Sequence, residues 1–154
     1  MKTEHKLCLL MFDEVSLKPN VTYQERKNKV TGLVHNGQER KCEFADHAQV
    51  FMVRGLIYNY KQAVPYAFSS SATKVPELAK QIKEVITGLQ EAGLTVVASV
   101  CDQGTNNRQA LKLLLNETRG IYLRKGEELK ENVILLNDQE IIPLFGPATP
   151  SQRN

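Results

Sequence analysis

The sequence predicts an α/β domain built on a mixed five-stranded sheet flanked by helices, with elements in the order β-β-β-α-β-α-β. Three observations lead to this prediction. Segments rich in β-branched and aromatic residues come first, two helical patterns follow, and apolar strands lie between and after the helices. Three successive strands form a meander, and strand–helix–strand units then add parallel strands by right-handed crossovers.

Three segments supply the predicted meander. The run Leu7–Phe12 is apolar on both faces, as in a strand buried on both sides, and it ends at Asp13. A second strand, Val30–His35, alternates and stops at Asn36–Gly37, a strong turn signal. The third strand, Ala48–Tyr58, is rich in β-branched and aromatic residues.

A linker and a helix come next. Pro65 and three serines, residues 69–71, indicate the linker. In the helix that follows, Pro76 stands in the first turn and Gly93 provides the stop. Apolar residues recur along it at helical spacing, namely Val75, Leu78, Ala79, Ile82, Ile86 and Leu89.

Another strand, another helix and two short apolar runs are predicted in the second half of the chain. Residues 94–101 form a fourth apolar strand that ends at Asp102, and Asn106 or Asn107 is a candidate cap for a second helix that halts near Gly120. Its apolar face carries Leu111, Leu114 and Leu115. A last pair of apolar runs, 133–136 and 140–145, surrounds Asn137 and Asp138. We therefore expect a domain over residues 1–145 and a disordered tail over 146–154.

Composition excludes some classes of protein but does not identify the function. The 154 residues are 42% apolar and 24% charged, as in a soluble globular domain. The net charge of +3 comes from basic and acidic residues mixed along the chain, which permits a polyanion partner without implying one. Cys8, Cys42 and Cys101 have no zinc-site spacing, and no signal peptide or membrane span is visible. These features favour a reducing intracellular compartment.

Two carboxylates form the strongest candidate site. If the first and fourth strands lie side by side and parallel, Asp13 and Asp102 meet at their carboxyl ends, where open α/β sheets bind ligands. Two close carboxylates favour a cation between them, and their oxygens suit Mg²⁺ or Mn²⁺. Such a pair serves phosphoryl transfer with two metals about 4 Å apart. Taken singly, Asp102 is better explained as an ordinary turn residue and Asp13 as a solvated strand end; their joint position at neighbouring strand ends is what favours a site.

Other polar groups are weaker candidates. The stretch "GTNN" lacks the lysine of a P-loop. His5, His35 and His47 lie near turns or the terminus and are best interpreted as surface residues. Arg54 is expected to extend to solvent or to pair with an acid. Scattered basic groups could contact a nucleic-acid backbone, although such groups are more often a solvated surface.

Three stretches carry a family resemblance: "FDEVSLKPNVTY", "ADHAQVFMVRGLIYNYKQAVPYAFS" and "SVCDQGTNNRQALKLLL". Together they resemble the RNase H-like catalytic domain of P-element-type DNA transposases, a family that includes host-domesticated relatives with a THAP-type zinc finger. The resemblance runs from about Leu7 to Phe145. It implies the same order of elements that the residue patterns predict.

The resemblance also implies a chemistry. The family performs cut-and-paste DNA transposition, in which a metal-activated water hydrolyses a phosphodiester and the freed 3′-hydroxyl attacks target DNA. Asp13 matches the first acid of the family's D-D-E set and Asp102 the second, so both are expected to ligate Mg²⁺ or Mn²⁺. Gln103 and Asn107 match the motif around the second acid without an assigned role. The implied partners are transposon ends and target DNA, with a nuclear location, no membrane and a possible homo-oligomer.

The sequence departs from the family in its last part. The family continues with a GTP-binding insertion and a late helix that carries the third acid, a glutamate, and this chain stops before both. After Phe145 the family's usual segment is replaced by Gly146, Pro147, Ala148 and Thr149. We therefore expect a catalytic-domain fragment, truncated before the final helix and inactive alone. The alternative is a non-catalytic, domesticated remnant that binds nucleic acid or protein, and metal-dependent nicking of DNA separates the two.

Overall fold

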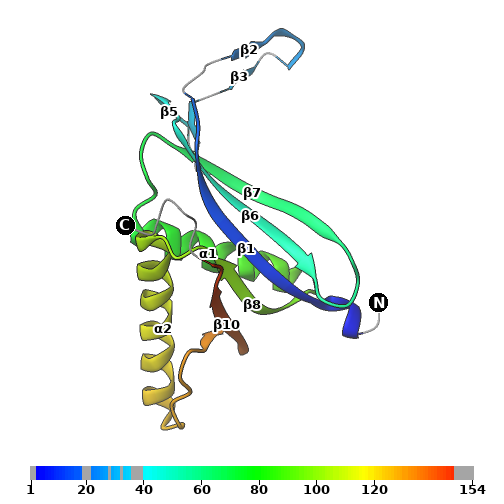
Figure 1. The fold of residues 1–154 in the computed structure, drawn as a ribbon, viewed down its shortest axis with the longest axis vertical. Coiled ribbons are helices and arrows are strands. Elements are labelled where there is room, and N and C mark those ends of the chain that lie inside the picture. Colours follow the sequence, from blue (N-terminus) through cyan, green and yellow to red (C-terminus); the bar gives the residue numbers. More distant parts are fainter. Residues whose placement is uncertain (1–2, 19–21, 28, 32, 36–39, 148–154) are drawn as a thin grey trace.

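The computed structural model describes residues 3–18, 22–27, 29–31, 33–35 and 40–147, and it shows a mixed sheet with two long helices (Figure 1). The helices are α1 (Val75–Glu91) and α2 (Thr105–Lys125). The strands are β1 (Leu7–Ser16), β2 (Thr22–Gln24), β3 (Lys29–Thr31), β4 (Leu33–His35), β5 (Arg40–Phe44), β6 (His47–Gly55), β7 (Lys61–Ser69), β8 (Thr95–Cys101), β9 (Ile134–Leu136) and β10 (Gln139–Phe145). Two short 3₁₀ turns, Thr3–Lys6 and Glu25–Lys27, complete the described elements.

The main sheet has the order β5-β4-β7-β6-β1-β8-β10-β9, and β2 pairs with β3 apart from it. Its central five strands form a mixed sheet of the predicted class, with β7 in place of the predicted second strand. β1 pairs antiparallel with β6, and β6 antiparallel with β7, which makes the meander. β1 and β8 are parallel neighbours, as are β8 and β10. The predicted fold class is therefore confirmed, and β4, β5 and β9 extend its two edges.

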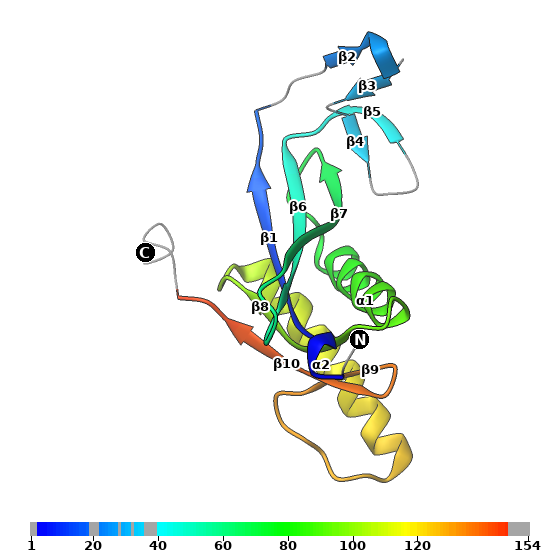
Figure 2. The same ribbon diagram turned by 90° about the vertical axis from the view of Figure 1, so that its right-hand side faces the viewer.

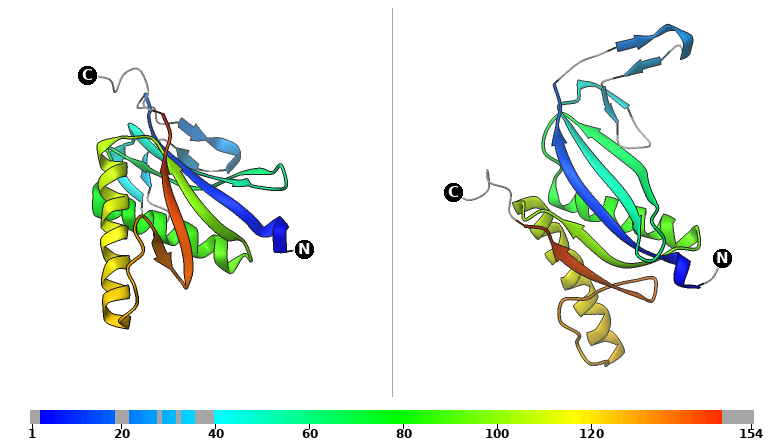
Figure 3. Two further views of the ribbon diagram at one scale, coloured as in Figure 1. Left: turned by 60° about the horizontal axis from the view of Figure 1, so that its bottom comes forward. Right: turned by 45° about the vertical axis from the view of Figure 1, so that its right-hand side comes forward.

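Both helices cover the same face of the sheet, as two turned views show (Figures 2 and 3). This follows from the topology, because the β7-α1-β8 and β8-α2-β10 crossovers advance in the same direction across the sheet. The core lies between the helices and this face. Its largest buried members include Leu10, Phe51, Leu78, Ile82, Ile86, Leu111, Leu114 and Ile141.

The strand expected over Ala48–Tyr58 ends earlier than predicted, at Gly55. There the chain makes a tight hairpin turn, in which the Gly55 amide donates to the Tyr60 carbonyl at 3.0 Å. A Cβ at position 55 would lie 2.2 Å from the Tyr58 carbonyl oxygen, so only glycine fits this turn. The apolar residues that continue the pattern beyond it lie exposed at the hairpin tip.

The predicted linker around Pro65 is wrong, because these residues form β7. Proline cannot donate a backbone hydrogen bond to a neighbouring strand, but the pairing of β6 with β7 is irregular between Gln49 and Phe51. This irregularity leaves Pro65 outside the regular register. Val30–His35 likewise does not form the strand beside β1; its described residues contribute to β3 and β4. The turn expected at Asn36–Gly37 lies outside the described residues.

The helix α1 agrees with the prediction, with Pro76 in its first turn and Gly93 beyond its end at φ 88°. The helix α2 begins earlier and ends later than predicted. It continues through Gly120 because buried residues on both sides of this glycine, Thr118 and Tyr122, keep the helix packed. It stops at Gly126, whose φ of 68° gives a left-handed cap.

The last two strands confirm the predicted hairpin. β9 and β10 pair antiparallel, and Asn137 and Asp138 between them have φ values of 49° and 62°. Two positive φ values are what a two-residue turn of this kind requires. Of the expected tail, only Gly146 and Pro147 are described. Neither α1 nor α2, the long helices of the described ranges, is apolar enough to cross a bilayer.

Candidate metal centre

The parallel pairing of β1 with β8 brings the two candidate aspartates to the same end of the sheet. In this register Met11 lies opposite Val100. Asp13 and Asp102 each follow two residues later, so they extend from the same edge. The prediction that the first and fourth strands are parallel neighbours is confirmed. Figure 3 shows β1 and β8 side by side at the centre of the sheet.

The sequence suggested that Asp13 lies at the end of its strand, but the strand continues beyond it. β1 continues to Ser16 because its other edge stays paired with β6, where Asp13 lies opposite Val50. What ends near Asp13 is the pairing with β8, whose last partner on β1 is Met11. The carboxylate therefore lies where one strand continues past the end of its neighbour.

The pKa of Asp13 is raised above its ordinary value. The largest cause is partial desolvation at the sheet edge, and a hydrogen bond from the Glu14 amide (2.8 Å) opposes it. The negative charge of Asp102 raises the pKa further, and that of Glu14 adds to the effect. Two like charges thus act on each other across this edge, which is the electrostatic condition for binding a cation.

Asp102 is held by the first turn of α2. Its Oδ1 accepts hydrogen bonds from the Gly104 amide at 3.0 Å and from the Asn107 side-chain amide at 2.6 Å. Asn107 is buried, with 6% of its surface exposed, so its side chain is fixed by its surroundings. A Cβ on Gly104 would lie 3.0 Å from the same oxygen, which explains the glycine at this position.

The predicted asparagine cap of α2 is wrong, and the contacts of the two asparagines explain why. The residue at the cap position is Gly104, which offers no side chain. Asn107 donates to Asp102 instead, and Asn106 donates to the Thr73 carbonyl at 3.1 Å. Both amides therefore organise the strand end rather than the helix end.

Thr73 joins the two halves of the site. Its amide donates to Glu14 Oε2 at 2.8 Å, and its carbonyl accepts the bond from Asn106. Glu14 comes from β1 and Asn106 from α2, so this buried loop residue links the residue after Asp13 to the residue before Asn107.

Gln103 contacts the chain after β10, where its side-chain amide donates to the Gly146 carbonyl at 3.4 Å. The Gly146 amide donates to the Cys101 carbonyl at 2.7 Å. Cys101 is a buried free thiol whose pKa is raised to about 12, first by burial and then by the charges of Asp102 and Asp13. A thiol with this pKa is protonated at neutral pH.

The remaining polar candidates lie elsewhere. His5 packs against Tyr58 with ring centroids 4.0 Å apart, and His47 contacts Asp46 at 2.5 Å. Arg54 is exposed on β6, and His35 belongs to β4. Within the described part of the chain, no group of three or more acidic, histidine or cysteine side chains gathers as a metal cluster. The aspartates are therefore a pair, with positions for at most part of a cation's coordination shell.

Comparisons with known proteins agree with this architecture. The family model described as "TNP-like, RNase H N-terminal domain" matches residues 1–115. A solved structure titled "Drosophila P element transposase strand transfer complex" superposes with a TM-score of 0.63 and 24% sequence identity. The match covers 93% of this chain and 27% of that one, so the chain spans about a quarter of the solved relative. No curated protein gives a significant match.

The family model spans most of the chain and includes both aspartates and the turn that holds Asp102. The solved structure shares the fold over nearly all of it. The chain therefore belongs to the TNP-like RNase H N-terminal domain family.

Proposed function

We propose that Asp13 and Asp102 ligate Mg²⁺ or Mn²⁺ in the phosphoryl-transfer site of a transposase. The observation that carries the proposal is the parallel register of β1 and β8, which sets both aspartates at one sheet edge. The raised pKa of Asp13 supports it, since a bound cation would relieve the repulsion behind part of that shift. The metal would supply an activated water and stabilise charge on the phosphate.

DNA is the substrate that this proposal implies. The solved relative is named as a strand transfer complex of a transposase. By analogy, the reactions here would be hydrolysis of a phosphodiester and attack of the freed 3′-hydroxyl on a second DNA. Asp102 would act from a fixed position, because Asn107 and Gly104 hold its Oδ1.

The pair forms part of a metal site rather than a whole one. Mg²⁺ prefers octahedral coordination, and two carboxylates leave most of it to water or to other ligands. We propose that a third acid, and the GTP site that the family uses, come from other parts of a transposase. The domain described here would then bind a metal weakly and would not cleave DNA by itself, because small displacements of reacting groups cost about a hundredfold in rate.

Paramagnetic broadening by Mn²⁺ tests the metal proposal. Amide signals of Glu14, Gln103 and Gly104 should broaden first in a titration of the wild-type chain. In Asp102→Asn the same signals should need a much higher Mn²⁺ concentration. Broadening that begins instead near the acidic residues at the far end of α2 would contradict the assignment.

A nicking assay tests the second part of the proposal. The chain is incubated with supercoiled plasmid and a labelled duplex in Mn²⁺, beside Asp13→Ala. We expect equal, background levels of nicking in both samples. Nicking that depends on Asp13 would show a complete site in this chain alone and would overturn the proposal that other segments complete it.

A further inference from the structure

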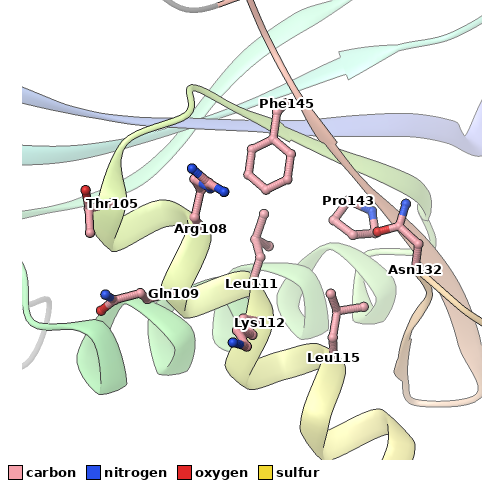
Figure 4. A pocket seen from close by; sticks show the side chains of 9 residues that line it. All are labelled: Thr105, Arg108, Gln109, Leu111, Lys112, Leu115, Asn132, Pro143 and Phe145. Carbon is pink, nitrogen blue, oxygen red and sulfur yellow. The ribbon is translucent and has the colours of Figure 1, made fainter. Parts of the chain in front are cut away.

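A groove of about 400 Å³ runs between α2 and β10 (Figure 4). On the helix side its lining includes Arg108, Lys112 and Leu115, and on the strand side Pro143 and Phe145. In Figure 4 the ring of Phe145 points from β10 toward α2, and the Arg108 side chain lies beside it. We call these five residues and the space between them the α2–β10 groove.

The groove opens at the same edge of the sheet as the aspartate pair. Phe145 lies opposite Cys101 in the β10–β8 register, and Cys101 immediately precedes Asp102. Thr105, which also lines the groove, begins α2 three residues after Asp102. A strand of nucleic acid whose phosphate reached the aspartates would therefore pass the mouth of the groove.

The chemistry of the lining is that of a nucleotide site. Arg108 and Lys112 stand one helical turn apart and are exposed, and neither forms an ion pair with a described residue. Phe145 is 45% exposed, although it is a large aromatic residue in a strand. Cations that meet phosphates, beside an aromatic face on which a base stacks, are the elements of single-strand recognition.

A second cavity among the described residues gives a contrast. It lies at the far end of α2, and its lining includes Lys130 and Glu140. Those two charges are already paired with each other, and Tyr122 donates to the same carboxylate. That cavity has no unpaired positive charge of this kind to offer an anion, whereas the α2–β10 groove has two.

We propose that the α2–β10 groove binds an unpaired DNA strand next to the aspartate pair. One base lies against Phe145 and Pro143, and two neighbouring phosphates lie against Arg108 and Lys112. The proposal rests on the proposed function, since it places the flanking nucleotides of the strand on which the aspartates act. An acidic, apolar peptide is the competing occupant; the position of the groove beside the aspartates favours the nucleic acid.

Fluorescence anisotropy with a labelled single-stranded oligonucleotide tests the cation contacts. The measurements use EDTA, so that they do not depend on the metal site. Arg108→Ala/Lys112→Ala should bind roughly tenfold more weakly than wild type, and the slope of log K against log salt should fall by about 1.4, or roughly 0.7 per phosphate. The matched control Lys80→Ala/Arg124→Ala removes two exposed cations outside the groove and should behave like wild type.

Phe145 provides the test for the base. Phe145→Ala should weaken single-strand binding by roughly tenfold with an unchanged salt slope, and Phe145→Trp should restore it. Blunt duplex, whose bases are all paired, should not distinguish these variants. Equal affinity and slope for wild type and the Arg108/Lys112 double variant would overturn the proposal, as would displacement of the strand by an acidic peptide that binds the groove more tightly. Groove-dependent DNA binding together with absent Mn²⁺ binding would contradict the metal proposal alone.

Discussion

Two clusters of titratable groups lie at opposite ends of α2. The charges repel each other in one cluster and attract each other in the other. At the first end, Asp13 and Asp102 are like charges, and the pKa of Asp13 is raised by desolvation and by its neighbours. At the other end, Lys130 pairs with Glu140. There the hydrogen bond to Lys130 lowers the pKa of Glu140, and the same bond raises the pKa of Lys130.

The two clusters differ in whether their neighbouring charges repel or attract each other. The Lys130–Glu140 cluster satisfies its own charges in the free protein, so it needs no further ligand. In the aspartate pair, Asn107 holds Asp102, and the charge of Asp102 raises the pKa of Asp13. Thr73 links the neighbouring residues Glu14 and Asn106. Like charges held close together by fixed hydrogen bonds make a candidate cation site, as proposed above.

The largest effect is expected for Asn107→Ala, which removes the donor that orients Asp102. Mn²⁺ affinity should fall by about 10–100-fold, as for other residues that orient metal ligands. Calorimetric titration measures it. Asn116→Ala is the control, because this asparagine is exposed on the same helix. Unchanged affinity in Asn107→Ala would show that the Gly104 amide alone holds the carboxylate.

Asn106→Ala should act mainly on stability. It leaves the carbonyl of the buried Thr73 without its side-chain donor, and we expect a loss of about 1 kcal/mol in the free energy of unfolding. Urea denaturation measures the change. Mn²⁺ affinity should fall less than in Asn107→Ala, since Asp102 keeps both donors. A larger metal effect in Asn106→Ala than in Asn107→Ala would reverse the roles assigned to these two residues.

Asp102→Asn should stabilise the metal-free protein at neutral pH, by less than about 1 kcal/mol because Asp13 is solvent-exposed. A raised folded-state pKa means that the folded state binds protons more tightly, so stability is lost as pH rises through the ordinary aspartate range toward that pKa. Removing the charge of Asp102 lowers the pKa of Asp13 and recovers part of the loss. Carboxyl NMR titration should show the lower pKa, and the stability difference should vanish in acid. A rise in the Asp13 pKa would contradict the coupling.

The smallest effect is expected for Lys130→Met, at the exposed pair. The pKa of Glu140 should rise toward its ordinary value when its partner is removed. A depressed folded-state pKa contributes stability above the ordinary glutamate pKa and loses it as pH falls. The small difference in thermal midpoint between wild type and Lys130→Met should therefore disappear at low pH and at high salt. A difference that persists under both conditions would indicate a packing role for the lysine stem.

The sequence predicted the central sheet and the site better than it predicted the edges. Hydrophobic runs such as Leu7–Phe12 and residues 94–101 are long and two-sided, which fixes them as buried central strands. Their order along the chain was enough to make them parallel neighbours and to bring Asp13 and Asp102 to one edge. β1 extends past Asp13 because it also pairs with β6, and no residue pattern near Asp13 indicates that pairing.

The errors came where tertiary contacts overrode local signals. Pro65 favours a linker, but an irregularity opposite Val50 allows it within β7. Asn106 and Asn107 favour a helix cap, but their amides bind Thr73 and Asp102, which only the folded chain brings near. In the sequence, Asn107 matches the family motif around the second acid, but the motif assigns it no role. The structure supplies that role as the donor that orients a carboxylate.

Calorimetric titration with Mn²⁺ tests the metal centre most directly. The set is wild type, Asp13→Asn, Asp102→Asn, and Asp138→Asn as a control that removes a carboxylate at the β9–β10 turn, where asparagine tolerates the positive φ. We predict weak binding to one site in wild type and Asp138→Asn, and a loss of at least about tenfold in each site variant. Equal Mn²⁺ affinity in all four proteins would show that the two aspartates do not form a metal site.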